Sequence, residues 1–214
     1  PDVALLLRNL ADLLMTKADY KQALPMALRS LDIREKALGT NHLDVANSLN
    51  TLARLYQTMG DYGPALPAFQ RSLDIREKAL GPDHPDVAQS LNNLGLLYQS
   101  MGLFDRALPA FQRSLAILEK TLGPDHPDVA MTLSNLALLY EAKGDHDSAL
   151  PALQRSLRIN EKVLGPNHPD VAITLNNLAD LFRSKGDATQ AQPLFERALT
   201  IEEKAFGPDH PDVA

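Results

Sequence analysis

The sequence predicts an all-α solenoid, in which helical hairpins stack side by side along the chain. Three observations lead to this prediction. The 214-residue chain repeats itself every 42 residues without insertion or deletion, with Asp-Val-Ala following residues 1, 43, 85, 127, 169 and 211. Each period holds two stretches with apolar residues at three- and four-residue steps, the spacing of one helix face. A fixed period of this length indicates stacked repeats, because each hairpin buries its apolar side only against a neighbour.

The period divides the chain into five repeats, 1–42, 43–84, 85–126, 127–168 and 169–210, and residues 211–214 open a sixth. We expect one continuous solenoid, in which each repeat contacts only its neighbours. Because the chain starts and stops on the same tetrad, we also expect it to be part of a longer array.

The first helix of a repeat is best seen in repeat three, where it is expected from Pro85 to Gly102. Proline suits a first helical position, since its missing N–H would have no partner there. Asp86 places a negative charge in the first turn, which favours the helix dipole. Gly102 can adopt the left-handed conformation that ends a helix.

The second helix carries a recurring proline, at Pro25, Pro67, Pro109, Pro151 and Pro193. A proline deep inside a helix costs about 3 kcal/mol. We therefore expect a late start near Arg106, with Asp105 as N-cap and Gly63, Asp147 and Thr189 at the equivalent positions. Gly123 is expected to end this helix.

These residues resemble the tetratricopeptide repeat, whose spacing is matched in repeat three by Leu91, Leu94, Gly95, Tyr98, Gly102, Phe104, Ala107, Phe111 and Leu115. The family's usual unit has about 34 residues. The longer unit found here is similar to those of kinesin light chain and of the sensor arrays of signalling ATPases. The resemblance implies a right-handed superhelix, with first helices lining a concave face that binds peptides or protein partners.

That concave face is expected to consist of first-helix residues beside the packed stripe. They are Leu5, Arg8, Asp12 and Met15; Asn47, Asn50, Arg54 and Gln57; Gln89, Asn92, Leu96 and Gln99; Met131, Ser134, Leu138 and Glu141; and Ile173, Asn176, Asp180 and Arg183. Asparagine and glutamine can donate and accept, so they suit an extended peptide backbone. The alternative is that these polar side chains only solvate the groove.

Recurring polar residues outside this set have a structural interpretation. Histidine recurs at His42, His84, His126, His168 and His210. It is interpreted as a loop residue that closes the turn into the next helix; the alternative is a ladder of metal sites. Recurring arginines (Arg29, Arg71, Arg113, Arg155 and Arg197) are expected to pair with an acid of their own or a neighbouring repeat. Asn9, Asn93, Asn135 and Asn177 are expected to bond backbone between helices.

Composition excludes several other functions. The chain has 21 basic and 27 acidic residues, a net charge of −6 that argues against nucleic acid as partner. It has no cysteine, no run of about 20 apolar residues and no nucleophile–base motif. We therefore expect no enzyme, cofactor, metal or membrane association, and a cytoplasmic location.

The ends suggest a second kind of function. The opening helix is unusually apolar, with Leu5, Leu6 and Leu13, and the last repeat presents Phe195, Leu199 and Phe206. Such faces would allow copies to stack end to end, as a scaffold with no groove ligand. Repeats two and three share 29 of 42 residues. A repetitive partner or self-assembly would both be consistent with such similar units.

Overall fold

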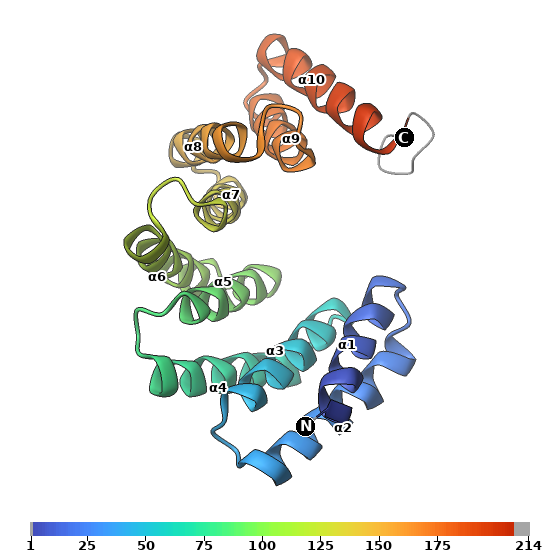
Figure 1. Cartoon of the computed structure of the whole chain (residues 1–214). Helices are drawn as coiled ribbons and strands as arrows, with labels where there is room; N and C mark the ends of the chain where they lie inside the picture. Colours follow the sequence, from blue (N-terminus) through green and yellow to red (C-terminus); the bar gives the residue numbers. More distant parts are fainter. Residues whose placement is uncertain (1, 208–214) are drawn as a thin grey trace. The chain divides into compact units, whose positions relative to one another are not determined.

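The computed structural model describes residues 2–207, and over this range the chain forms α-helices and no strand (Figure 1). The helices are α1 (Asp2–Thr16), α2 (Tyr20–Leu38), α3 (Leu43–Thr58), α4 (Tyr62–Leu80), α5 (Pro85–Ser100), α6 (Phe104–Leu122), α7 (Pro127–Ala142), α8 (His146–Leu164), α9 (Pro169–Ser184) and α10 (Ala188–Phe206). The predicted all-α class is confirmed. Odd-numbered helices are the first helices of the repeats, and even-numbered helices are the second.

The helices divide into two compact units, one up to Ile117 and one from Leu118. In the first unit α1 packs on α2 and α3 on α4; in the second, α7 packs on α8 and α9 on α10. A second helix also packs on the next first helix, as α2 does on α3, α4 on α5 and α8 on α9. The predicted stacking of hairpins is thus confirmed within each unit, and one continuous array of five repeats stays a prediction.

Small residues let the two helices of a hairpin approach closely. A buried serine of the second helix donates to an alanine carbonyl of the first, over 2.7–2.9 Å, in four repeats. The pairs are Ser30 with Ala4, Ser72 with Ala46, Ser114 with Ala88, and Ser156 with Ala130. The alanine side chains are themselves fully buried. A larger residue at either position would force the helices apart.

The recurring histidines begin the first helices. His42, His84, His126 and His168 are N-caps, and each Nδ1 accepts the backbone N–H two residues later over 3.1–3.2 Å. This satisfies one of the amide donors that a helix start leaves unpaired. The structural interpretation of the histidines is confirmed for these four, and His210 lies outside the described residues. Among residues 2–207, no group of three metal-ligating side chains comes together.

Replacing His84 by alanine is expected to lower the free energy of unfolding by about 1 kcal/mol, because the Asp86 amide loses its acceptor. Replacement by asparagine, whose side-chain oxygen can accept the same amide, should retain most of the stability. Urea denaturation followed by circular dichroism measures both. Equal losses in the two variants would contradict a capping role.

The predicted start of the second helices is wrong by two residues. The N-caps are Asp19, Asp61, Asp145 and Asp187, and α6 likewise begins at Phe104 rather than Arg106. Three of these aspartates accept the amide three residues later, that of Gln22, Ser148 or Gln190. The recurring proline is therefore the sixth residue of its helix, well inside the first two turns.

These prolines are tolerated because they face solvent. Each lies on the exposed side of its helix, as does the residue four positions earlier, to whose carbonyl a proline has no N–H to donate. For Pro109 that residue is Asp105. Water can satisfy an exposed carbonyl, so the lost bond costs less than it would inside the core. A prediction that treats every proline as a helix breaker, whether or not it faces solvent, therefore places the start of the second helix too late.

Candidate binding surface on the first helices

The predicted binding residues lie on the first helices, α1, α3, α5, α7 and α9. Most of them are at least partly exposed, and the exposed members on these helices are Leu5, Arg54, Gln89, Met131, Ile173 and Arg183. Asn92 is different, because only 5% of it is exposed. Its amide is held inside the fold, so Asn92 does not belong to a binding surface. The first-helix surface below means the remaining residues of this set.

Two consecutive first helices contact each other, and the second helix that lies between them in the sequence packs against both. We call each such contact region a junction. The contacts of α1 with α3, α3 with α5 and α7 with α9 define three junctions within the two units. The second helix contributes one side chain to each junction, at the position of Arg34, Arg76 and Asn160. The equivalent residue is Leu118 in repeat three and Glu202 in repeat five. This position therefore differs between the junctions, with arginine at two of them and asparagine at the third.

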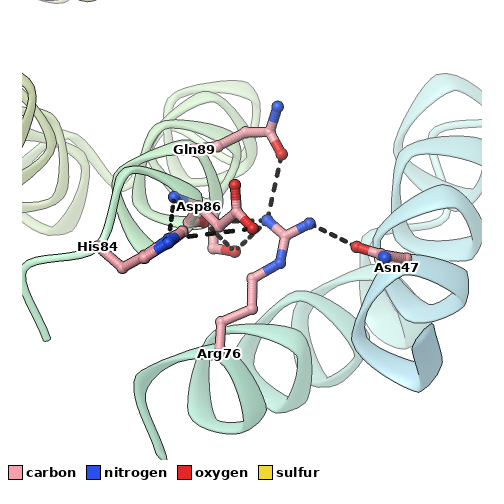
Figure 2. A network of polar contacts seen from close by, with 6 residues as sticks. Asn47, Arg76, His84, Asp86 and Gln89 are labelled. Carbon is pink, nitrogen blue, oxygen red and sulfur yellow. Dashed lines mark hydrogen bonds and ion pairs between the residues drawn. The ribbon is translucent and has the colours of Figure 1, made fainter. Parts of the chain in front are cut away.

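Arg76 closes the α3/α5 junction (Figure 2). Its Nη1 donates to the Asp86 carbonyl at 3.0 Å, to Ser90 Oγ at 2.9 Å and to Gln89 Oε1 at 3.2 Å. Its Nη2 donates to Asn47 Oδ1 at 2.9 Å. Arg76 is 5% exposed, and burial lowers the pKa of its guanidinium, an effect that the Asp86 carboxylate partly offsets. One arginine of α4 thus links α3 to α5.

Further side-chain bonds continue this closure along α3 and α5. Asn93 Nδ2 donates to Asn50 Oδ1 at 2.8 Å, and Gln57 Nε2 donates to Ser100 Oγ at 3.3 Å. Four predicted binding residues (Asn47, Asn50, Gln57 and Gln89) therefore bind other residues of the fold at this junction. A ligand here would have to replace those bonds.

The α1/α3 junction is closed in a similar way. Arg34 Nη1 donates to the Asp44 carbonyl at 2.9 Å and to Ser48 Oγ at 2.8 Å. Arg54 lies 3.6 Å from the carboxylate of Asp12 across the two helices. Arg34 is 4% exposed, and burial lowers its pKa as it does for Arg76. The first unit thus presents junctions that its own arginines fill.

The α7/α9 junction is open. Asn160 of α8 replaces the arginine, and its Nδ2 donates to Thr174 Oγ1 at 3.1 Å. Met131 and Ile173 stand where Asn47 and Gln89 stand at the α3/α5 junction, and they are 49% and 55% exposed. A pocket of about 400 Å³ lies here, lined by Met131, Ser134, Leu138, Ile173, Thr174 and Asn177 with Asp128, Asp170 and Asn160.

Beyond this pocket, Glu141, Asp180 and Arg183 form a charged end of the surface. Arg183 binds Asp180 at 2.7 Å on α9. Burial raises the pKa of Glu141, and the nearby Asp180 carboxylate raises it further. Asn176 donates weakly to Glu202 of α10, at 3.5 Å. The chemistry of this end is mixed, so the pocket is the more specific feature.

The recurring arginines of the second helices pair as expected. Arg71, Arg113, Arg155 and Arg197 bind Glu35, Glu77, Glu119 and Glu161 of the preceding second helix, over 2.5–2.6 Å. Each also donates to a loop carbonyl 31 residues earlier. These bridges tie successive repeats on the side of the second helices. They occupy the arginines, which are therefore structural.

Sequence reasoning missed the junction position. Arg34 and Arg76 are not part of a recurring set, because Leu118, Asn160 and Glu202 replace them in the later repeats. The usable signal was this variation itself, inside a period that is otherwise well kept. A position that changes while its surroundings repeat is where the repeats acquire different surfaces.

No helix of residues 2–207 is both long and apolar enough to cross a membrane. Among curated proteins, none matches this chain. Among solved structures, nearly identical TPR-like repeats of a candidate kinesin light chain from Podosopora anserina share 27% identity, with a TM-score of 0.76 over 94% of this chain and 95% of that one. BtubC (BKLC) from P. vanneervenii shares 26% identity, with a TM-score of 0.78 over 94% of this chain and 80% of that one.

MamA from Desulfovibrio magneticus has 18% identity and a TM-score of 0.64, covering 96% of this chain and 98% of that one, which shows a similar fold. The sequence profile of the tetratricopeptide repeat matches residues 2–78, 65–120, 86–162, 128–204 and 170–214. These matches together cover nearly the whole chain and agree with the stacked hairpins described above. The chain therefore belongs to the tetratricopeptide repeat family.

Proposed function

We propose that this chain is a protein–protein interaction module that binds a peptide or protein partner along its first-helix surface. Tetratricopeptide repeat proteins generally serve protein–protein interaction or act as scaffolds, and are typically not enzymes. The observation that carries the proposal is the open α7/α9 junction, with two exposed apolar side chains over a polar floor. Concave sites of this kind, apolar with a few polar groups, are typical of ligand binding. We place the module in the cytoplasm.

The proposal can be tested with a random peptide library displayed on phage and selected against the full chain. Selected peptides are then titrated into the wild type and two variants by calorimetry. Ile173→Lys puts a positive charge at the pocket, whereas Val163→Lys puts the same charge on α8, at a side chain that is 47% exposed and outside the pocket lining. We expect about a tenfold weaker binding for the first variant and little change for the second. Failure to select any peptide, or equal binding to all three proteins, would contradict the proposal.

A second candidate function is a scaffold in which copies stack end to end. Exposed apolar side chains favour it: Leu6 and Leu13 of α1 are 66% and 52% exposed, and Leu199 and Phe206 of α10 are 42% and 46% exposed. Leu5 is 42% exposed, while Phe195 is only partly exposed. The proposed occupant of the α1 face is α10 of a second copy. Such a head-to-tail contact would leave each end free for another copy.

Light scattering across a range of protein concentrations separates the two candidates. Stacking predicts a mass that rises with concentration, and a loss of this rise when Leu6 and Leu13 are both replaced by glutamate. A constant monomer mass at the highest concentration would remove the scaffold candidate. Peptide binding at the α7/α9 junction would be unaffected by these end substitutions.

A further inference from the structure

The α7/α9 pocket occupies the place that an arginine side chain fills elsewhere in the same molecule. At the α3/α5 junction this side chain is Arg76, whose guanidinium lies between the two first helices. The equivalent residue in repeat four is Asn160, which is shorter by several atoms and donates to Thr174. The cavity of about 400 Å³ therefore lies beside Asn160, at the position where repeats one and two carry an arginine.

The walls of the pocket suit a long aliphatic stem. Met131 and Ile173 are about half exposed, and Leu138 lies beside them. An arginine or lysine side chain buries its methylene groups along such apolar surface while its charged head stays near polar groups. Norleucine or leucine would use the same walls but leave the polar part of the pocket without a partner.

The polar part of the pocket is acidic. Among the described residues that line it, Asp128 and Asp170 are negatively charged and none is a lysine, arginine or histidine. Nδ1 of His126 and Nδ1 of His168 accept the backbone amides of these aspartates and lie 3.6 and 3.7 Å from their carboxylates. The amide oxygen of Asn160 is a further acceptor at the floor. The pocket therefore offers acceptors and negative charge to a cationic donor.

We infer that the α7/α9 pocket binds an arginine side chain of a partner peptide, in the place that Arg76 fills at the α3/α5 junction. Its stem lies against Met131, Leu138 and Ile173, and its guanidinium faces the carboxylates of Asp128 and Asp170. Arginine is favoured over lysine because its planar group carries five donors that can serve several acceptors at once. This inference rests on the proposed function and names the partner chemistry of the same surface.

The test uses the full chain, labelled with nitrogen-15, and three capped peptides of sequence Gly-Ser-X-Ser-Gly, in which X is arginine, citrulline or norleucine. Citrulline has the shape of arginine without its charge. We expect amide shifts at Ile173 and Thr174, and an affinity for the arginine peptide about tenfold above that for the other two. Added salt should weaken the binding of the arginine peptide more than that of the two uncharged peptides, because the carboxylates of Asp128 and Asp170 are exposed to solvent.

A matched pair of variants identifies the pocket. Asn160→Arg supplies the side chain that repeats one and two carry at this position, so it should fill the pocket and reduce arginine-peptide affinity at least about tenfold. Val163→Arg adds the same charge on the same helix outside the pocket, and it should bind as the wild type does. Circular dichroism confirms that both variants are folded before the titration.

Equal affinity for the three peptides, or wild-type affinity in Asn160→Arg, would overturn the arginine assignment. The two proposals fail in distinguishable ways. If library-selected peptides bind and lose affinity in Ile173→Lys while the arginine peptide shows no preference over the other two, only the arginine assignment fails. If no selected peptide and no arginine peptide binds, the proposed function fails with it.

Discussion

Replacing Arg76 by alanine is expected to lower the free energy of unfolding by about 2–4 kcal/mol. The guanidinium is 5% exposed and makes four hydrogen bonds, to α3 on one side and α5 on the other. Its removal leaves a cavity at the junction and takes away the donors that Asn47, Gln89 and Ser90 face. Asn47 is partly exposed and Gln89 is exposed, so their side chains can regain water, whereas the buried Ser90 keeps only its bond to the Asp86 carbonyl, at 3.2 Å. The main loss therefore comes from the buried end of the network and from the cavity.

Arg71 of the same helix provides the matched control. Its bridge to Glu35 is 2.6 Å long, but the side chains are 39% and 29% exposed. Exposed ion pairs contribute about 0–1 kcal/mol, so Arg71→Ala should cost far less than Arg76→Ala. Urea denaturation of both variants at one pH and salt concentration gives the comparison. Equal losses would show that the buried network contributes no more than an ordinary surface bridge.

Arg76→Leu refines the same test, because Leu118 is the natural occupant in repeat three and is itself buried. Leucine fills volume, so this variant should cost less than Arg76→Ala. It should still be less stable than the wild type. Leu118 is followed on the next first helix by Met131 and Thr132, whereas Arg76 is followed by Gln89 and Ser90, which accept from its guanidinium. Thr132 donates to the Asp128 carbonyl at 2.9 Å, and Ser90 likewise donates to the Asp86 carbonyl at 3.2 Å. Leucine at position 76 donates no hydrogen bond, so Asn47 Oδ1 and Gln89 Oε1 lose the donor that they now share.

The fold was largely predictable from sequence because one pattern was repeated five times. Hydrophobic spacing, the helix-ending glycines and the first-helix starts at Pro85, Pro127 and Pro169 agree with the structure. The second-helix start was not predictable from the proline alone. That required knowing that Pro109 faces solvent, which follows from how the hairpin packs and not from local propensity.

The candidate site was predictable only in part. The spacing placed Ser134, Leu138, Met131 and Ile173 on one face, and the structure brings these four to one pocket. The prediction from periodicity assigned the same positions to the binding face in all five repeats, so it could not distinguish an open junction from a closed one. That difference depends on one side chain from another helix, Asn160 in place of arginine, whose reach into the junction is a tertiary property. The same reasoning explains why Asn92 was misplaced: its burial depends on its neighbours.

Replacing Phe111 is expected to have the other large effect. Its side chain is fully buried, and truncation to alanine should cost about 3–5 kcal/mol. The ring lies against the backbone of α5 at Gly95. A Cβ atom added to Gly95 would lie 2.6 Å from Cε1 and 2.7 Å from Cδ1 of Phe111, much closer than carbon atoms approach. Glycine at this position is therefore needed for the ring where it now lies.

This contact predicts a reversal of sign in a double-mutant cycle. In the wild type, Gly95→Ala should destabilise by about 1–2 kcal/mol, because displacement of a buried ring outweighs the gain of about 1 kcal/mol in helix propensity. In a Phe111→Leu background, the same change should stabilise the protein, since the ring is gone and the added methyl group fills space. Repeat four already carries this combination, Ala137 and Leu153, and both are buried.

Repeat two supplies the control for the cycle. There Ala53 faces Phe69, and both are buried in one cluster, so the ring of Phe69 must lie further from its first helix than the ring of Phe111 does. Ala53→Gly should thus destabilise through lost helix propensity and a lost methyl group, by about 1 kcal/mol. Urea denaturation of the single and double variants measures all three effects. If Gly95→Ala changes the free energy of unfolding in the same direction in the wild type and in Phe111→Leu, the close approach of the Phe111 ring does not determine the need for glycine at position 95.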